Sequence, residues 1–447
     1  MKLSFAAMPL FVVFAAPVPL AAQSGAAPLV TFAKDIAPIL QQKCQVCHQP
    51  NSIAPMSLLT YDDAKDFAQE IRENVSGRRM PPWHIDKTVG IQAFKNDRGL
   101  SDAQIASIVK WVDAGSPMGD AKDLPAPVKF PDANRWQLAD NFGAPDLVIR
   151  SQPFTVPAQG EDKWFRPLTE TGLTETRWVR AIEIKPVDAM ARRVVHHVLA
   201  SLQQEEVGVT GLAHDAHDAQ TSGGLFMEWA VGKTGQIFPN DAGKLLLPGS
   251  KIRWEIHTHS IGQEFKNEAV ELAVYLYPKG VVPPHRTVLR LFDVSRGSEL
   301  DIAPNQTAMT QNFYVLQAPA RLENFQPHMH MRGRAMSLEA IYPTGRKEML
   351  SQVNNFQWNW HVNYVYADSV APLLPKGTTL VFTAWHDNTA NNPNNPDPRQ
   401  WVGWGDRTVD EMAHCWIDVT YLDQAEFDTL VAARAPRGRG GRGNMRK

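Results

Sequence analysis

The sequence feature that most constrains this chain is the run Cys44-Gln-Val-Cys47-His48. Two cysteines separated by two residues, with a histidine directly after them, are typical of the attachment site of a c-type haem. The spacing suits that chemistry, because the two thiols form thioethers to the porphyrin while the adjacent imidazole binds the iron as its proximal ligand. The motif therefore predicts a covalently bound haem c on Cys44, Cys47 and His48.

Thioredoxin-like redox sites and structural zinc sites also contain a Cys-x-x-Cys pair. A structural zinc ion needs about four Cys or His ligands. The whole chain has only 3 cysteines, and the third, Cys415, is far away in sequence. A second Cys-x-x-Cys pair is thus excluded, as is an intramolecular disulfide once the haem has used its pair, and we favour the haem.

Two predicted helices bracket the haem motif. Residues 32–43 carry apolar side chains at helical spacing and lead into the motif. Residues 102–114 follow a predicted capping box formed by Ser101 and Gln104. Helices on both sides of such a motif resemble a cytochrome c domain, which we expect at residues 30–120.

The sixth ligand of the haem iron is expected between these helices. Met80 is the strongest candidate, because the prolines that follow it stiffen the backbone and could hold its thioether against the haem face. A methionine opposite a histidine raises the reduction potential of the iron. Met56 and His84 are the alternatives, since a methionine is more often a packing residue than a ligand.

The N-terminus has the layout of a secretory signal. Lys2 precedes an apolar run over residues 5–16, and small residues lead to a cleavage point near Ala22. The apolar run is too short to span a bilayer comfortably, which argues against a membrane anchor. We therefore expect a signal peptide at residues 1–22 and a periplasmic or secreted protein with no membrane anchor after cleavage.

Composition indicates a globular, multidomain protein. The chain has 447 residues, of which 43% are hydrophobic and 21% charged, with a formal net charge of -2. At roughly 150 residues each, two to four domains are expected. The charge balance gives no reason to expect a nucleic acid partner. The Arg/Gly-rich end at residues 433–447 resembles RNA-binding segments, but in an exported protein we expect a disordered, solvated tail.

Beyond a Pro- and Asp-containing linker at residues 121–145, the pattern changes to short strands. They are rich in β-branched and aromatic residues and are separated by Pro, Gly and Asn turns, as in sandwiches and jelly rolls. We therefore predict a small all-α cytochrome c domain followed by two all-β jelly-roll sandwich domains, at residues 146–284 and 285–425. The predicted strands are residues 177–184, 194–202, 252–258, 269–277, 336–342, 379–385 and 416–421.

Histidines are concentrated in this all-β part, as one adjacent pair, two His-x-His pairs and scattered single residues. These are His196 and His197, His257 and His259, His328 and His330, and singly His214, His217, His361 and His386. Alternate residues of a strand share a face, so a His-x-His pair can offer two imidazoles to one metal. Adjacent His196 and His197 can do so only if the strand ends or bulges there. Imidazole suits copper, zinc and iron, and a thioether such as that of Met412 beside two imidazoles favours copper.

The first half of the all-β part contains Asp162, the segment 177–186, Val194-Val-His-His-Val198 and Glu255-Ile-His257. These motifs resemble the copper type II, ascorbate-dependent monooxygenases, the family of the peptidylglycine α-hydroxylating and dopamine β-monooxygenases. The resemblance implies that His196, His197 and His257 hold an electron-transfer copper. His259 has no counterpart in the family.

The second half contains Pro327-His-Met-His330-Met-Arg-Gly333, Leu374-Pro-Lys-Gly377, Asp387-Asn388 and Asp410-Glu-Met412. These motifs resemble, in the right order, the dioxygen-binding domain of the same family. The resemblance implies that His328, His330 and Met412 hold the second of two copper ions and are the catalytic residues. It further implies that O2 and one electron from each copper hydroxylate a C–H bond of the substrate, in a cleft between the domains.

Three residues depart from the family pattern. Where peptide-amidating members hold the substrate carboxylate, this chain carries Gln326, His414 and Trp416. The charged clamp is not carried over, and the disulfides common in the animal enzymes are missing. The resemblance thus implies a bacterial-type relative with a different small-molecule or peptide-like substrate, such as a neutral or aromatic one.

A tethered cytochrome would raise the effective concentration of an electron donor near the copper sites. We therefore expect haem, ascorbate or both to supply electrons, with a redox partner protein as a further source. The alternative hypothesis is a non-catalytic exported electron-transfer or copper-binding protein, against which the six presumed copper ligands argue. A zinc hydrolase is a third hypothesis, but the sequence shows no recognisable glutamate beside the histidines that could act as the general base.

Overall fold

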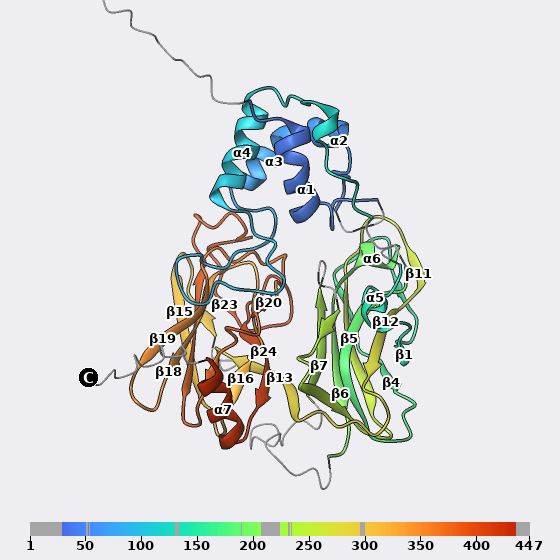
Figure 1. Cartoon of the computed structure of the whole chain (residues 1–447), viewed down its shortest axis with the longest axis vertical. Coiled ribbons are helices and arrows are strands. Elements are labelled where there is room, and N and C mark those ends of the chain that lie inside the picture. The colour runs from blue at the N-terminus through green and yellow to red at the C-terminus, as the bar shows by residue number, and fades with distance from the viewer. Residues whose placement is uncertain are drawn as a thin grey trace, which may run out of the picture.

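The protein, seen here as a computed structural model, is mostly β-sheet with few helices, as a β-sandwich architecture requires (Figure 1). The structure describes residues 29–434 except 51, 53, 130–133, 189, 207–223, 231–232, 234 and 296–299. The predicted signal peptide at 1–22 and residues 435–447 of the predicted tail lie outside the described residues. Within these ranges, no helix is long and apolar enough to cross a membrane.

The helical part lies at one end of the molecule and carries the Cys-x-x-Cys-His motif (Figure 1). It packs around Ile36, Leu40 and Trp111, which are all 0% exposed. Both predicted helices and the predicted capping box are confirmed, since Ser101 Oγ accepts from the Gln104 amide and the Gln104 side chain accepts from the Ser101 amide. The elements are η1 (Phe32–Ile36), α1 (Ala37–Lys43), α2 (Tyr61–Asp66), α3 (Ala68–Ser76) and α4 (Asp102–Asp113).

The first β unit, residues 147–276, has an apolar core of its own, which includes the fully buried Trp254. Two short helices, α5 (Ala139–Phe142) and α6 (Ala191–Val194), lie beside its sheet. Its strands are β1 (Leu147–Arg150), β2 (Phe154–Val156), β3 (Lys163–Phe165), β4 (Leu168–Glu170), β5 (Arg177–Pro186), β6 (Val195–Gln203), β7 (Leu225–Ala230), β8 (Gln236–Ile237), β9 (Ala242–Leu246), β10 (Lys251–Thr258), β11 (Phe265–Glu268) and β12 (Val270–Leu276).

The second β unit, residues 285–421, has a separate apolar core and is followed by helix α7 (Gln424–Arg434). Its strands are β13 (His285–Asp293), β14 (Asp301–Ile302), β15 (Thr307–Val315), β16 (Ala320–Leu322), β17 (Asn324–Met329), β18 (Gly333–Ile341), β19 (Lys347–Val353), β20 (Tyr364–Val365), β21 (Leu373–Leu374), β22 (Thr379–Asp387), β23 (Val402–Gly403) and β24 (Ala413–Tyr421). All seven predicted strands are confirmed, with ends displaced by up to three residues, as β5, β6, β10, β12, β18, β22 and β24.

Strand β13 joins the two β units into one extended sheet. It pairs antiparallel with β24 from Thr287↔Thr420 to Asp293↔His414. On the side of the first β unit it meets β7 at Leu289↔Leu225 and runs parallel to β9 at His285↔Ala242. His197 and His257 of the first unit and His328 of the second are therefore carried by strands of the same sheet system.

The predicted cytochrome domain, residues 30–120, is not self-contained. Trp83 and Ile85 belong to the apolar core of the second β unit rather than to that of the helices. Ile85 forms an isolated β-bridge with Val353, and the Trp83 ring lies 4.8 Å from that of Tyr364. An indole and an isoleucine side chain have much apolar surface to bury. Trp83 and Ile85 bury it against the second β unit.

The predicted linker, residues 121–145, ends in a packed segment. Leu138 is 7% exposed and lies against Ala181 and Tyr275 of the first β unit. The Glu183 carboxylate accepts the backbone amides of Gln137 and Leu138 at 2.9 Å each. The chain is thus fixed to the first β unit before β1 begins.

We expect Trp254→Ala to destabilise the first β unit by about 3–5 kcal/mol, because the change empties a site in a closed core. It also removes the hydrogen bond from Trp254 Nε1 to Thr169 Oγ1. The exposed Trp401, at 65%, is the matched control, and Trp401→Ala should shift stability by no more than about 0.5 kcal/mol. Thermal unfolding followed by circular dichroism measures both, and equal shifts for the two variants would contradict the packing.

Candidate functional site

A bulge in strand β6 brings the adjacent His196 and His197 to one place. In the β6–β10 ladder His257 pairs with His197, but the next residue of β10, Thr258, pairs with Val195. His196 is therefore the extra residue of a β-bulge, which turns a side chain that would otherwise point to the opposite face. The expectation that the strand must end or bulge at these histidines is confirmed.

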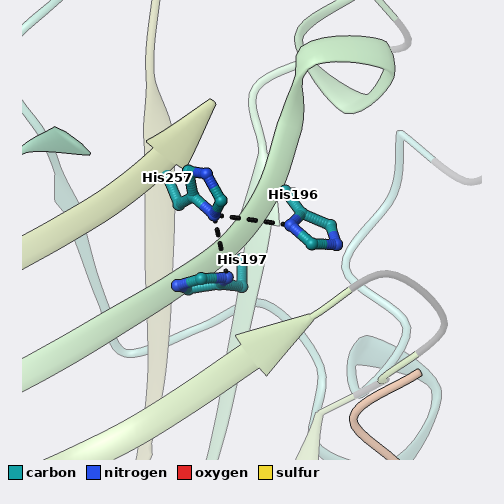
Figure 2. A group of neighbouring side chains, drawn as sticks. All are labelled: His196, His197 and His257. Carbon is teal, nitrogen blue, oxygen red and sulfur yellow. Dashed lines mark hydrogen bonds between the residues drawn. The ribbon is translucent and has the colours of Figure 1, made fainter. Parts of the chain in front are cut away.

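The three imidazoles of the first histidine set, His196, His197 and His257, converge on one point (Figure 2). Nδ1 of His257 lies 3.4 Å from Nδ1 of His196 and 3.3 Å from Nδ1 of His197. Nitrogen ligands about 2.0–2.1 Å from one ion are separated by roughly such distances. The set can therefore hold a single metal ion. In the part of the chain that the structure describes, it is the one group of three His, Cys, Asp or Glu side chains spaced in this way.

These imidazoles are neutral at physiological pH. Burial, with the neighbouring histidines, lowers the pKa of His196 to about 3 and that of His197 well below its ordinary value. Burial also lowers the pKa of His257, although Asp162 opposes the shift. An imidazole must be unprotonated to bind a metal, so these three side chains are already in the state that binds an ion.

Asp162 fixes the ring of His257 from behind. One carboxylate oxygen lies 2.9 Å from Nε2 of His257 and the other 2.7 Å from Nδ1 of the exposed His259. The indole of Trp164 stacks on the His257 ring at 4.5 Å and 5°. A carboxylate on the far nitrogen selects the tautomer that leaves Nδ1 of His257 free for a metal. His259 thus contacts the partner of a candidate ligand.

The second histidine set, His328 and His330, is carried at the end of β17. His328 pairs with His414 of β24, and Met329 with Ala413. Continued by one residue, this register brings His330 opposite Met412. Because alternate strand residues share a face, the two imidazoles and the Met412 side chain are expected on one face.

The nitrogen atoms of the second set are available to bind a metal. Nδ1 of His328 is buried and makes no hydrogen bond to any described residue. Nδ1 of His330 lies 3.2 Å from the Asp410 carbonyl, which leaves Nε2 as the free donor. Burial lowers the pKa of His330 to about 4 and that of His328 well below its ordinary value, so both are neutral.

Glu411, the residue before Met412, ties the two strands together. Its carboxylate accepts the backbone amides of His330 at 2.9 Å and Arg332 at 2.5 Å. Burial raises the pKa of Glu411 to about 8 despite these hydrogen bonds. Glu411 therefore fixes the backbone of the His-x-His segment against the segment that carries Met412.

Sequence reasoning missed the part that His361 plays. Its ring lies 4.5 Å from that of His328 and 5.6 Å from that of His197, so it contacts a member of each set. It follows an irregular stretch and has no spacing relation to any other histidine, so no local pattern could have singled it out. His414 was noticed only as a departure from the family, and its ring stacks on His328 at 4.5 Å and 24°.

Gln326 and Trp416, two of the three residues that depart from the predicted family pattern, lie at a buried polar network. Gln326 Nε2 donates to Glu228 Oε2 at 2.6 Å, and Lys233 Nζ lies 3.0 Å from the same oxygen. Burial opposes ionisation of Glu228, but Lys233 and His361 outweigh it and lower its pKa to about 2. Trp416 pairs with Gln326 across the β17–β24 ladder. The network links the first β unit to the second. Its one lysine, Lys233, is paired with Glu228.

The haem motif lines a largely apolar cavity of about 880 Å³, part of it open to solvent, which we call the haem-motif cavity. Nδ1 of His48 lies 3.3 Å from the Met56 carbonyl, so Nε2 is left for an iron, and burial lowers the His48 pKa. Both Met80 and Met56 line the cavity. His84 lies instead at Tyr364, whose hydroxyl accepts its backbone amide.

The thiols of the motif fit covalent attachment. Cys44 and Cys47 are unpaired and line the haem-motif cavity with His48. Burial and the neighbouring Cys47 raise the pKa of Cys44 to about 12, so the thiol is neutral. An apolar cavity with two thiols, one oriented imidazole and two thioethers has the donors that a c-type haem needs.

Comparisons with known proteins add no argument about function. The sequence matches no model of a known protein family and no curated protein. Among solved structures, Broad Bean Stain Virus has 8% identity over 62% of this chain and 88% of the other, with a TM-score of 0.24. A two-domain protein of unknown function from Bacteroides fragilis has 8% identity over 66% and 100%, with a TM-score of 0.15. Likenesses this weak carry no argument.

If copper binds at the first histidine set, we expect His257→Ala to abolish that binding, because it removes one of three converging donors. His259→Ala is the matched control, since that exposed side chain contacts Asp162 and no imidazole of the set. Copper content after anaerobic loading, measured by elemental analysis, should fall for His257→Ala alone. Unchanged copper in His257→Ala would contradict the assignment of this set.

Proposed function

We propose that this chain is an exported haem- and copper-containing monooxygenase that hydroxylates a substrate C–H bond with O2. Electrons would pass from c-type haem, from ascorbate or from both through two copper sites. In this proposal the helical part is a cytochrome c domain, and the two β units are jelly-roll sandwiches of the copper type II monooxygenase kind.

One observation carries the proposal: the bulge at His196 gathers three Nδ1 atoms, two pairs of which are 3.3 and 3.4 Å apart. A bulge breaks a regular ladder, and two adjacent histidines gain a common focus only by such a break. With the Asp162 carboxylate at Nε2, Nδ1 of His257 carries a lone pair that faces Nδ1 of both neighbouring rings. An ion at their common point would bind all three neutral imidazoles at once. The arrangement therefore favours a metal over packing.

The second set favours copper over zinc. The β17–β24 register, continued by one residue beyond Met329 and Ala413, would place Met412 opposite His330. A thioether is a soft donor that suits Cu(I). Bound copper ions would supply the one-electron cycling between Cu(I) and Cu(II) and the site for dioxygen activation.

The chain's own polar residues set the class of substrate. Gln326 occupies the position of the charged clamp and is held by Glu228. Because the only cation bonded to this carboxylate among these residues, Lys233, is paired with it, no unpaired positive charge is offered to a substrate carboxylate at this position. A neutral or aromatic substrate is the class that suits this position, which lies beside the His414 and Trp416 rings, 4.7 Å apart.

The haem-motif cavity supports an electron-supply role for the helical part. Cys44, Cys47 and His48 would hold the haem, with Met80 or Met56 as the sixth ligand. A bound haem would supply single electrons at a potential that a methionine ligand raises. Trp360 of the second β unit also lines this cavity, so haem and histidine sets belong to one assembled unit.

The test is oxygen incorporation. The holoprotein, loaded with copper and reduced with ascorbate, is mixed with ¹⁸O2 and a panel of small neutral, aromatic and peptide substrates. We expect one ¹⁸O atom in a hydroxylated product, with His330→Ala as the inactive control. Peroxide alone, with no labelled product across the panel, would reject the monooxygenase and favour the non-catalytic electron-transfer protein.

A further inference from the structure

Two cavities of the molecule share a wall at Trp360. The haem-motif cavity is one of them. The other, which we call the inter-unit cavity, is lined by residues from all three parts of the chain, including Lys233, Gln236 and His361. The residues common to both linings are Pro82, Arg98 and Trp360. Of these, only Trp360 is aromatic. The next residue in the chain is His361, which contacts both histidine sets.

His361 lies between the two sets rather than beside one of them. Its ring centroid is 4.5 Å from that of His328, 5.6 Å from that of His197 and 6.2 Å from that of His196. The residue is 8% exposed. Its Nδ1 makes no hydrogen bond to a described residue and lies 3.5 Å from the buried Glu228 carboxylate. The ring is therefore held by packing and charge at the junction of the two sets.

The segment that contains Trp360 and His361 is fastened to the haem-bearing part. Asn96 Nδ2 donates to the Asn363 carbonyl at 2.7 Å, and the Val365 amide donates to Asn96 Oδ1 at 3.1 Å. Phe94 stacks on Tyr366 with ring centroids 5.7 Å apart. These hydrogen bonds and ring contacts hold the segment against the helical part, so that Trp360 stays in the wall of the haem-motif cavity.

We propose that Trp360 and His361 form the path by which an electron from the haem reaches the two histidine sets. The inference rests on the proposed function and names the residues that connect its parts. In each transfer the haem iron goes from ferrous to ferric, and one Cu(II) becomes Cu(I). No bond is made or broken, and a one-electron donor of the ascorbate class returns the haem iron to the ferrous state.

Pulse radiolysis tests the path without oxygen or substrate. The anaerobic holoprotein, with ferric haem and Cu(II), receives electrons at the haem, and the decay of the ferrous haem absorption is followed with the loss of the Cu(II) EPR signal. We expect a decay that requires copper and does not depend on protein concentration. Trp360→Leu should slow it by about tenfold or more, equivalent to about 1.4 kcal/mol of activation free energy.

Two further variants separate a path from a structural role. Trp360→Phe keeps an aromatic ring in the shared wall and should stay closer to the wild-type rate than Trp360→Leu. Trp358→Leu is the matched control, because Trp358 belongs to the same segment but packs against the core of the second β unit. It should leave the rate unchanged. Haem potential and the content of haem and copper are measured in every variant, so that a change of driving force or loading is recognised.

The outcomes distinguish this inference from the proposed function. Wild-type rates in both Trp360→Leu and His361→Gln, with haem and copper present, would overturn the path and leave the monooxygenase intact. Haem that keeps its electron in the wild-type protein would overturn both the path and the electron-supply role. Ascorbate-driven hydroxylation would then still support the copper chemistry.

Discussion

The antiparallel pairing of β6 with β10, broken by one bulge at His196, is the constraint on which the rest of the site depends. In an unbroken ladder His196 and His197 would point to opposite faces, and no common focus with His257 would exist. The bulge leaves His196 without a partner in the ladder and turns its imidazole toward those of His197 and His257. Asp162 then fixes the ring of His257. The second set needs no bulge, because His328 and His330 are two residues apart, and their ring centroids lie 5.2 Å from each other.

Local pattern predicted much of this arrangement. Strand alternation indicated the His-x-His pairs, and the need for a break at His196 and His197 followed from the same two-residue period. The seven predicted strands and both predicted helices are present. What the sequence could not supply are contacts between residues far apart in the chain. His361 meets His197 and His328 through tertiary packing alone.

The packing of the helical part against the second β unit also could not be predicted from local sequence pattern. Trp83 and Ile85 were assigned to the haem-bearing domain by their position in the chain, yet they complete the core of the second β unit. Amphipathic spacing indicates that a side chain is buried, but it does not indicate which part of the protein covers that side chain. This docking brings the haem-motif cavity to Trp360, whose neighbour in the chain, His361, contacts both histidine sets.

Anomalous diffraction from crystals of the loaded holoprotein tests the central claim most directly. Data collected at the copper edge should show one peak among His196, His197 and His257 and a second within bonding distance of His328, His330 and Met412. Data at the iron edge should show a peak between His48 and a methionine of the haem-motif cavity. Copper at neither histidine set, or zinc at both under copper-replete conditions, would contradict the account.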